Sequence, residues 1–146
     1  MMSAKVGDFL NASQEQAIIE AIRQAEMLTS GEIRVHLESK CSEPVKRAQE
    51  LFHLLKMDNT KEENGILFYV SIDDKKFALV GDRGIHARVG DDFWSSVRDE
   101  VLSRFRESEF QNGLIAGIEL VGKKLAAYFP WEVDDTNELS DEISVS

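Results

Sequence analysis

The sequence predicts a three-layer α/β/α sandwich with a small mixed β-sheet of three to four strands and helices on both faces. Three patterns support this fold class. Residues 65–72 form an unbroken apolar run, which is typical of a strand buried on both faces. Residues 32–38 alternate between apolar and polar side chains, as a strand does. Apolar residues recur at helical spacing in the segments around these two strands.

The predicted order of elements is helix, strand, helix, strand, strand, helix, helix. The strand–helix–strand unit implies a parallel pair of strands with a right-handed crossover. A polar turn at residues 73–76 joins the central strand to another apolar run, residues 77–80, which predicts an antiparallel hairpin. The sheet is therefore expected to be mixed.

The first half of the chain predicts a helix, a strand and a second helix. Residues 13–28 carry an apolar stripe, and Ser13 with Gln16 resembles a capping box at the start of a helix. The alternation in residues 32–38 predicts a strand with one face that is either solvent-exposed or functional, and therefore a position at an edge of the sheet. Pro44 suits the first turn of the second helix.

The second half ends in two predicted helices. The stripe that marks the first of them is Phe93, Val97, Val101 and Phe105. The last helix runs from about Leu114 to Phe129 and is stopped by Pro130. Gly117 and Gly122 lie inside it, and since glycine costs about 1 kcal/mol against alanine in a helix, we expect close packing there.

Length and composition predict one domain, residues 1–131, of a soluble protein. No apolar stretch reaches the roughly 18 residues of a membrane span, and the first residues lack the apolar core of a signal peptide. Cys41 is the single cysteine, so no intrachain disulfide can form, which fits a cytoplasmic location. The net charge of −10 argues against nucleic-acid binding and favours cations.

Residues 132–146 are expected to form a disordered, solubilising tail. The acids in this segment are Glu132, Asp134, Asp135, Glu138, Asp141 and Glu142, and it has no lysine or arginine. A segment of this composition offers little apolar surface to bury against the domain.

Strand directions place three loops at one end of the predicted sheet: residues 29–32, 58–64 and 82–92. Carboxylate and carbonyl oxygens are the ligands that Ca²⁺ prefers, and Mg²⁺ uses oxygen ligands too. The acids and the amide in these loops could therefore bind a divalent cation. The same residues also fit a structural role, with Asp91 and Asp92 starting a helix, Asp82 closing a turn and residues 58–64 simply solvated.

No other motif with a defined chemistry is present. The histidines have no zinc-ligand spacing, and the glycines after residue 80 lack the G-K-[ST] of a phosphate-binding loop. Arg83 and Arg88 could bind an anion such as phosphate near a metal, or pair with Asp91 and Asp92 on the surface. No nucleophile or general base for an enzyme can be identified from the residues.

Three segments resemble the TPM domain, a family named for a thylakoid lumen protein, a photosystem II accessory protein and a nematode receptor modulator. These segments are SGEIRVHLE (30–38), NGILFYVSIDDKKFALVGDRGI (64–85) and FQNGLIAGIELVGKKLAAYFP (110–130). The resemblance spans roughly residues 9–130 and is to the short stand-alone bacterial versions. It implies an α/β/α sandwich and divalent-cation binding, Ca²⁺ in particular, by acidic loops at one edge.

The resemblance places metal binding on Asp82, Asp91 and Asp92, and sheet geometry adds Asp58 and Asn64. It also implies two functions. The expected one is a soluble Ca²⁺-binding domain that acts as an accessory or interaction module for a protein partner that the sequence does not identify. The alternative is a metal-dependent acid phosphatase acting on phosphomonoesters, because some plant relatives are described as acid phosphatases.

Overall fold

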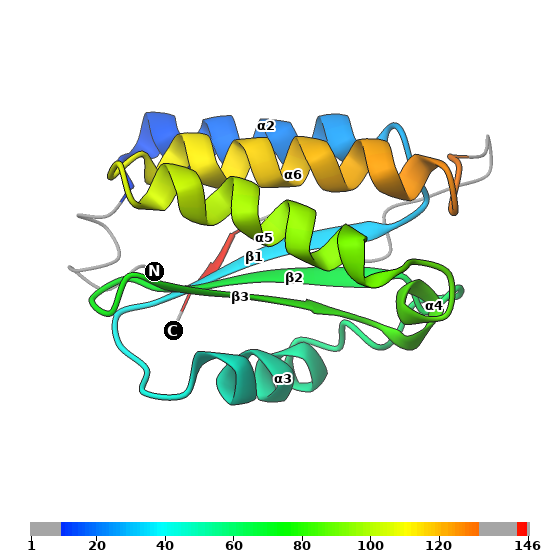
Figure 1. Cartoon of the computed structure of the whole chain (residues 1–146), viewed down its shortest axis with the longest axis horizontal. Coiled ribbons are helices and arrows are strands. Elements are labelled where there is room, and N and C mark those ends of the chain that lie inside the picture. Colours follow the sequence, from blue (N-terminus) through cyan, green and yellow to red (C-terminus); the bar gives the residue numbers. More distant parts are fainter. Residues whose placement is uncertain (1–9, 132–142, 146) are drawn as a thin grey trace.

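A computed structural model describes residues 10–131 and 143–145. In chain order its elements are α2 (Ala12–Glu26), β1 (Glu32–Glu38), α3 (Pro44–Leu54), β2 (Gly65–Ser71), β3 (Lys76–Gly81), α4 (Arg83–His86), α5 (Asp91–Phe105), α6 (Phe110–Ala126) and β4 (Ser144–Val145). The strands form a four-stranded sheet in the order β3-β2-β1-β4. Helices α2, α5 and α6 lie on one face of the sheet and α3 on the other, which confirms the α/β/α sandwich (Figure 1).

The strand directions agree with the prediction. β1 pairs with β2 in parallel, from Glu32 opposite Gly65 to Glu38 opposite Ser71. β2 pairs with β3 antiparallel across the turn that follows Ser71. Every residue of β2 is buried, so its continuous apolar run reflects cover on both faces and pairing at both edges.

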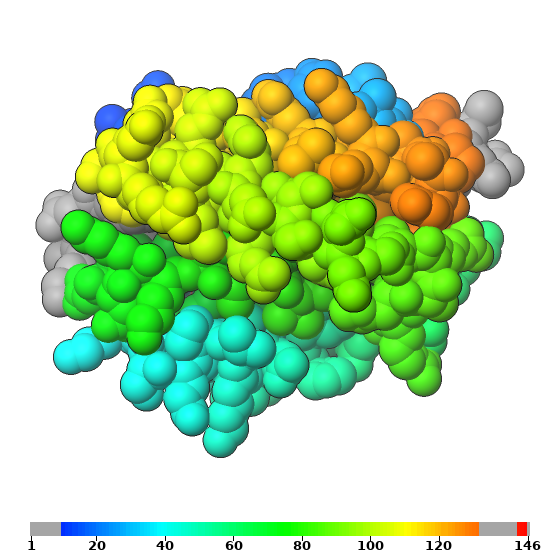
Figure 2. Space-filling model, in the orientation of Figure 1, coloured from blue at the N-terminus to red at the C-terminus, as the bar shows by residue number. Residues whose placement is uncertain are grey.

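The two faces of the sheet carry separate hydrophobic cores. The larger core contains Ile33, Val35 and Leu37 of β1 together with the apolar stripes of α2, α5 and α6. The smaller core joins α3 to β2 and β3, and its buried members are Ala48, Leu51, Phe52, Met57, Leu67, Tyr69 and Ala78. In the space-filling view α5 and α6 form one continuous layer, whereas α3 is a single band on the opposite side (Figure 2). The α3 layer is therefore the smaller one, with one helix against three.

The first helix begins earlier than its predicted cap. Asn11 is the N-cap: its side chain accepts from the Gln14 amide at 2.8 Å, and its own amide donates to Gln14 Oε1 at 2.9 Å. The capping box is therefore Asn11–Gln14 and not Ser13–Gln16. Asparagine caps at least as well as serine, so the sequence alone did not separate these two starts.

The expected edge position and exposed polar face of β1 were wrong. β4 pairs in parallel with the outer side of β1, opposite His36 and Leu37. Glu32, His36 and Glu38, which the alternation predicted to be solvated, are at most 7% exposed. Alternation separates two kinds of side chain on a strand, but it cannot distinguish a polar face in water from a buried face whose polar groups are paired.

Part of the predicted tail is structured. Ile143 is buried in the larger core at 8% exposure, and Ser144 and Val145 form β4. Residues 132–142 and 146 of the tail lie outside the described residues. The many acids in residues 132–142 favoured the prediction of a disordered tail. Ile143 and Val145, which follow this acidic stretch, are the apolar residues that make the short contact.

The glycines of α6 allow its close packing, as predicted. A Cβ at Gly117 would lie 2.5 Å from Val101 Cγ2 of α5 and 3.0 Å from Phe68 of β2, and one at Gly122 would lie 2.9 Å from the Ala25 side chain. No helix within residues 10–131 is long and apolar enough to cross a membrane.

We predict that Gly117→Ala destabilises the domain by about 1–3 kcal/mol, although alanine is the better helix former. The added methyl group overlaps Val101, a fully buried β-branched side chain that cannot rotate away freely. Urea unfolding of the variant measures the effect, with Glu119→Ala on the exposed side of α6 as the control. Equal stability of Gly117→Ala and the wild type would contradict the close contact.

Candidate functional site

Three loops meet at the end of the sheet where β1 and β2 begin and β3 ends. The Glu32 amide donates to the Asn64 carbonyl at 3.3 Å, and the Asp82 amide donates to the Gly65 carbonyl at 3.0 Å. The Gly84 amide donates to the Glu63 carbonyl at 2.8 Å. Residues 30–32, 60–64 and 82–84 are thus joined through their backbones, and we call this end of the sheet the loop edge.

Asp82 is a buried carboxylate of the loop edge, as is Glu32 at 3% exposure. It follows β3 directly and caps the short helix α4, where its Oδ1 accepts from the Arg83 amide at 2.7 Å. The residue is only 8% exposed. Its other oxygen, Oδ2, is buried and has no hydrogen-bond partner within the described part of the chain. A buried carboxylate oxygen needs a hydrogen bond or a cation to offset its lost hydration.

The loop before β2, residues 60–64, contacts the segment that begins at Asp82. Asn64 is buried at 2% exposure, with its amide bonded to Thr60 Oγ1 at 3.2 Å and its side-chain nitrogen donating to Ser30 Oγ at 3.2 Å. Ser30 in turn donates to Glu62 Oε2 at 2.7 Å. Sequence reasoning gave Ser30 and Glu62 no individual role, because a serine and a glutamate in a polar loop carry no recognisable spacing.

The backbone of this loop packs against α4. A Cβ at Gly84 would lie 2.2 Å from the Glu62 carbonyl oxygen and 2.6 Å from that of Glu63. Glu63 itself has a φ of 52°, in the left-handed region that ordinary residues avoid. Only glycine at position 84 leaves room for these two carbonyl groups, so the loop edge depends on it.

The other acids predicted as ligands lie apart from this arrangement. Asp91 and Asp92 are exposed in the first turn of α5. Asp58 is exposed and accepts a hydrogen bond at 2.8 Å from His53, which lowers the pKa of Asp58. Among residues 10–131 and 143–145, no three His, Cys, Asp or Glu side chains converge closely enough to hold a metal ion.

The two predicted anion-binding residues contact different partners. Arg83 forms an ion pair with Glu63 on the surface of the loop edge. Arg88 donates to the Tyr128 carbonyl at 3.0 Å, and its guanidinium lies 4.7 Å above the centre of the Phe129 ring. Arg88 therefore connects the segment after α4 to the residues that follow α6. Arg83 connects residues 82–84 to residues 60–64 of the loop edge.

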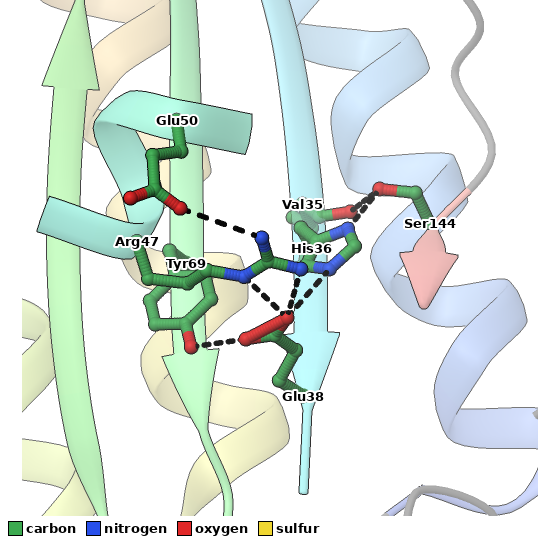
Figure 3. Close-up of polar contacts among 7 residues, drawn as sticks. All are labelled: Val35, His36, Glu38, Arg47, Glu50, Tyr69 and Ser144. Carbon is green, nitrogen blue, oxygen red and sulfur yellow. Dashed lines mark hydrogen bonds and ion pairs between the residues drawn. The ribbon is translucent and has the colours of Figure 1, made fainter. Parts of the chain in front are cut away.

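A second polar centre, which the sequence did not indicate, surrounds Glu38 (Figure 3). Arg47 of α3 holds Glu38 Oε1 through Nε and Nη2, both at 2.7 Å, and the Tyr69 hydroxyl donates to Oε2 at 2.6 Å. His36 Nε2 lies 4.0 Å from Oε1. We call His36, Glu38, Arg47 and Tyr69 the Glu38 cluster.

Proton affinities in the Glu38 cluster follow from burial and pairing. Burial, with the bond to Glu38 as a further cause, raises the pKa of Tyr69. The hydrogen bond to Glu38 raises the pKa of Arg47. Both groups thus keep their protons at neutral pH, and both oxygens of Glu38 are occupied. The cluster is therefore suited to fastening α3 to β1 rather than to accepting a further ligand.

The ring of His36 also contacts the C-terminal strand. His36 Nδ1 lies 2.8 Å from Ser144 Oγ, and this oxygen is 3.3 Å from the Val35 carbonyl oxygen (Figure 3). Because a carbonyl only accepts, the Ser144 hydroxyl donates to Val35 and His36 Nδ1 carries the hydrogen. Burial lowers the pKa of His36 to about 4, so the ring is neutral at pH 7.

We predict that His36 makes the domain less stable as the pH falls from about 6.5 to about 4. The unfolded histidine takes up a proton near pH 6.5, whereas folded His36 resists protonation down to about 4, so the unfolded state binds more protons in this window. The loss at pH 4 is on the order of 3 kcal/mol. Urea unfolding between pH 7 and pH 4 should therefore show a shallower decline for His36→Gln than for the wild type.

The matched control for this measurement is His86→Gln, because His86 is exposed and its ring stacks on Trp94 without an ion pair among the described residues. Identical pH profiles for wild type and His36→Gln would mean that His36 is not held neutral by burial.

Comparison with known proteins agrees with the fold. The TPM domain family model matches residues 5–124. No curated protein matches the sequence. The chain is similar to the BA42 protein of the psychrophilic bacteria Bizionia argentinensis, whose NMR structure has 50% sequence identity and a TM-score of 0.92. That match covers 99% of this chain and 100% of the other.

Two more distant structures share the fold alone. The N-terminal domain of the cg2496 protein from Corynebacterium glutamicum has a TM-score of 0.64 at 12% identity, over 94% of this chain and 80% of that one. The N-terminal domain of a protein from P. gingivalis has a TM-score of 0.67 at 22% identity, over 83% and 79%. The family model covers most of the sequence, and the chain belongs to the TPM domain family.

Proposed function

We propose that this chain is a divalent-cation-binding module, with Ca²⁺ as the preferred ion and Asp82 as the anchoring ligand at the loop edge. The observation that carries the proposal is the Asp82 carboxylate, which is buried and has one oxygen without a hydrogen-bond partner in the described part of the chain. A cation would compensate the charge of that oxygen, to which no group of the described chain donates a hydrogen bond.

The donors around Asp82 suit Ca²⁺ better than Mg²⁺. Ca²⁺ accepts six to eight oxygens in flexible geometry, including backbone carbonyls and water, whereas Mg²⁺ demands a near-ideal octahedron. The carbonyls of Glu62 and Glu63 lie against Gly84, and the Glu62 carboxylate contacts Ser30 beside Asn64. These carbonyl and carboxylate oxygens are ligand types that Ca²⁺ accepts.

The remaining predicted ligands would have to move toward Asp82. Asp91 and Asp92 are exposed and could approach through the segment between α4 and α5, while Asp58 would first release His53. We therefore propose a site completed by the ion, with Asp82, Asn64 and Glu62 as its starting point. Such a site favours moderate affinity, because part of the binding free energy is spent on ordering the loops.

The alternative function, a metal-dependent acid phosphatase, has no specific support among the described contacts. Arg83 and Arg88 would be its anion-binding residues, but the first pairs with Glu63 and the second with Tyr128 and Phe129. We therefore propose an accessory module that binds Ca²⁺ without chemistry of its own.

We predict that Ca²⁺ raises the melting temperature of the wild type and that Asp82→Asn abolishes this gain. At a Ca²⁺ concentration about 100 times Kd the stabilisation is about 2.7 kcal/mol. Asparagine still caps α4, so the variant should fold without the ion. Thermal unfolding with and without millimolar CaCl2 measures the difference, and Asp99→Asn on the exposed side of α5 is the control. A similar gain in Asp82→Asn would rule out Asp82 as the anchor.

A further inference from the structure

The outer edge of β1, which we call the slot, pairs over a short stretch with β4. Even-numbered residues of β1 bond to the β2 side, as Glu32 does with Asn64, so residues 33, 35 and 37 direct their backbone groups outward. The Ile33 amide donates to Glu26 Oε2 of α2 at 3.1 Å, which closes one end of the edge. β4 covers the other end, opposite His36 and Leu37.

The segment that occupies this slot, Ile143–Val145, contacts the domain through three side chains. Ile143 is buried in the larger core, and Val145 packs against the same core. Between them, Ser144 Oγ bonds to both His36 Nδ1 and the Val35 carbonyl (Figure 3). The slot thus has an apolar position, a hydroxyl position and a second apolar position.

The hydroxyl position is selective. A serine hydroxyl can accept from His36 and donate to Val35 at the same time. Alanine in its place would take away the Ser144 oxygen from a ring that is only 2% exposed, and burying polar groups without such bonds is unfavourable. An extended segment with serine at this position should therefore bind more tightly than one with alanine.

Among the described residues, the resident segment pairs with β1 over a short stretch. Only two of its residues pair with β1, and both are partly exposed. It follows residues 132–142, which carry six of the net ten negative charges and leave −10 + 6 = −4 on the rest of the chain. Residues 132–142 and the rest of the chain thus carry net charge of the same sign, whereas a competing segment flanked by lysine or arginine would be attracted to the chain.

We propose that the β1 edge binds an extended peptide segment of a partner protein, with the pattern apolar–Ser–apolar and basic flanking residues. In the isolated chain Ile143–Val145 occupies the slot and competes with the partner. A tethered competitor acts at an effective concentration in the millimolar range, so it lowers the apparent affinity of the partner without blocking it. The slot lies along β1 and uses none of the proposed cation ligands.

A peptide probe tests this proposal on the full-length chain. The probe is a fluorescent Lys-Lys-Ile-Ser-Val-Lys-Lys peptide, and the matched control peptide has alanine in place of serine. The proteins are the wild type and Ile143→Asp, which removes the apolar anchor of the resident segment and leaves the slot unchanged. Anisotropy gives the affinities, and amide NMR spectra verify folding and report on Val35, His36 and Leu37.

The expected result is at least roughly tenfold tighter binding of the probe to Ile143→Asp than to the wild type, because the competitor has been removed. The alanine peptide should bind roughly tenfold more weakly than the serine peptide. Amide shifts should centre on residues 35–37, and neither Ca²⁺ nor Asp82→Asn should change the affinity, which separates this slot from the cation site.

Two outcomes would overturn the proposal. One is equal or absent binding of the probe to both proteins while the NMR spectrum of Ile143→Asp shows a folded domain with an altered β1 edge. The other is loss of folding in Ile143→Asp and also in Val145→Asp, a milder change at a partly exposed position. In that case the resident segment would be an integral part of the core rather than an exchangeable ligand.

Discussion

The complete burial of β2 is the constraint on which the rest of the structure depends. A strand buried on both faces needs helices above and below it and strands at both edges. β1 and β3 supply the edges, α2, α5 and α6 cover one face, and α3 covers the other. The loop edge follows from the same constraint, because β1 and β2 start and β3 ends on one side of the sheet.

Among the four buried carboxylates of the described residues, Glu38 and Asp82 differ in how their charge is compensated. Glu38 accepts from Arg47 and Tyr69, so both of its oxygens have donors and it joins α3 to β1. Asp82 has a donor for one oxygen only among the described residues. The first arrangement is complete within the protein, whereas the second leaves a position that a cation would satisfy. This contrast, rather than the number of acids in the loops, directs attention to Asp82.

The sequence was sufficient for the fold and for the loops that meet, but not for the partners of individual side chains. Continuous apolar runs located β2 and β3, and helical periodicity located the major helices, since both patterns record which faces are buried. Neither pattern could place β4, because a two-residue strand has no period, and alternation misassigned the polar face of β1 to solvent. The Glu38 cluster joins residues 36, 38, 47 and 69 across three elements, and no spacing along the chain announces such a contact.

The unequal size of the two helical layers has a consequence for how the domain opens. Three helices share the larger core, whereas α3 is held by a small group of apolar contacts and by the bond between Arg47 and Glu38. Local opening free energies follow the buried contacts of each unit. The amides of α3 should therefore exchange with solvent well before those of β2.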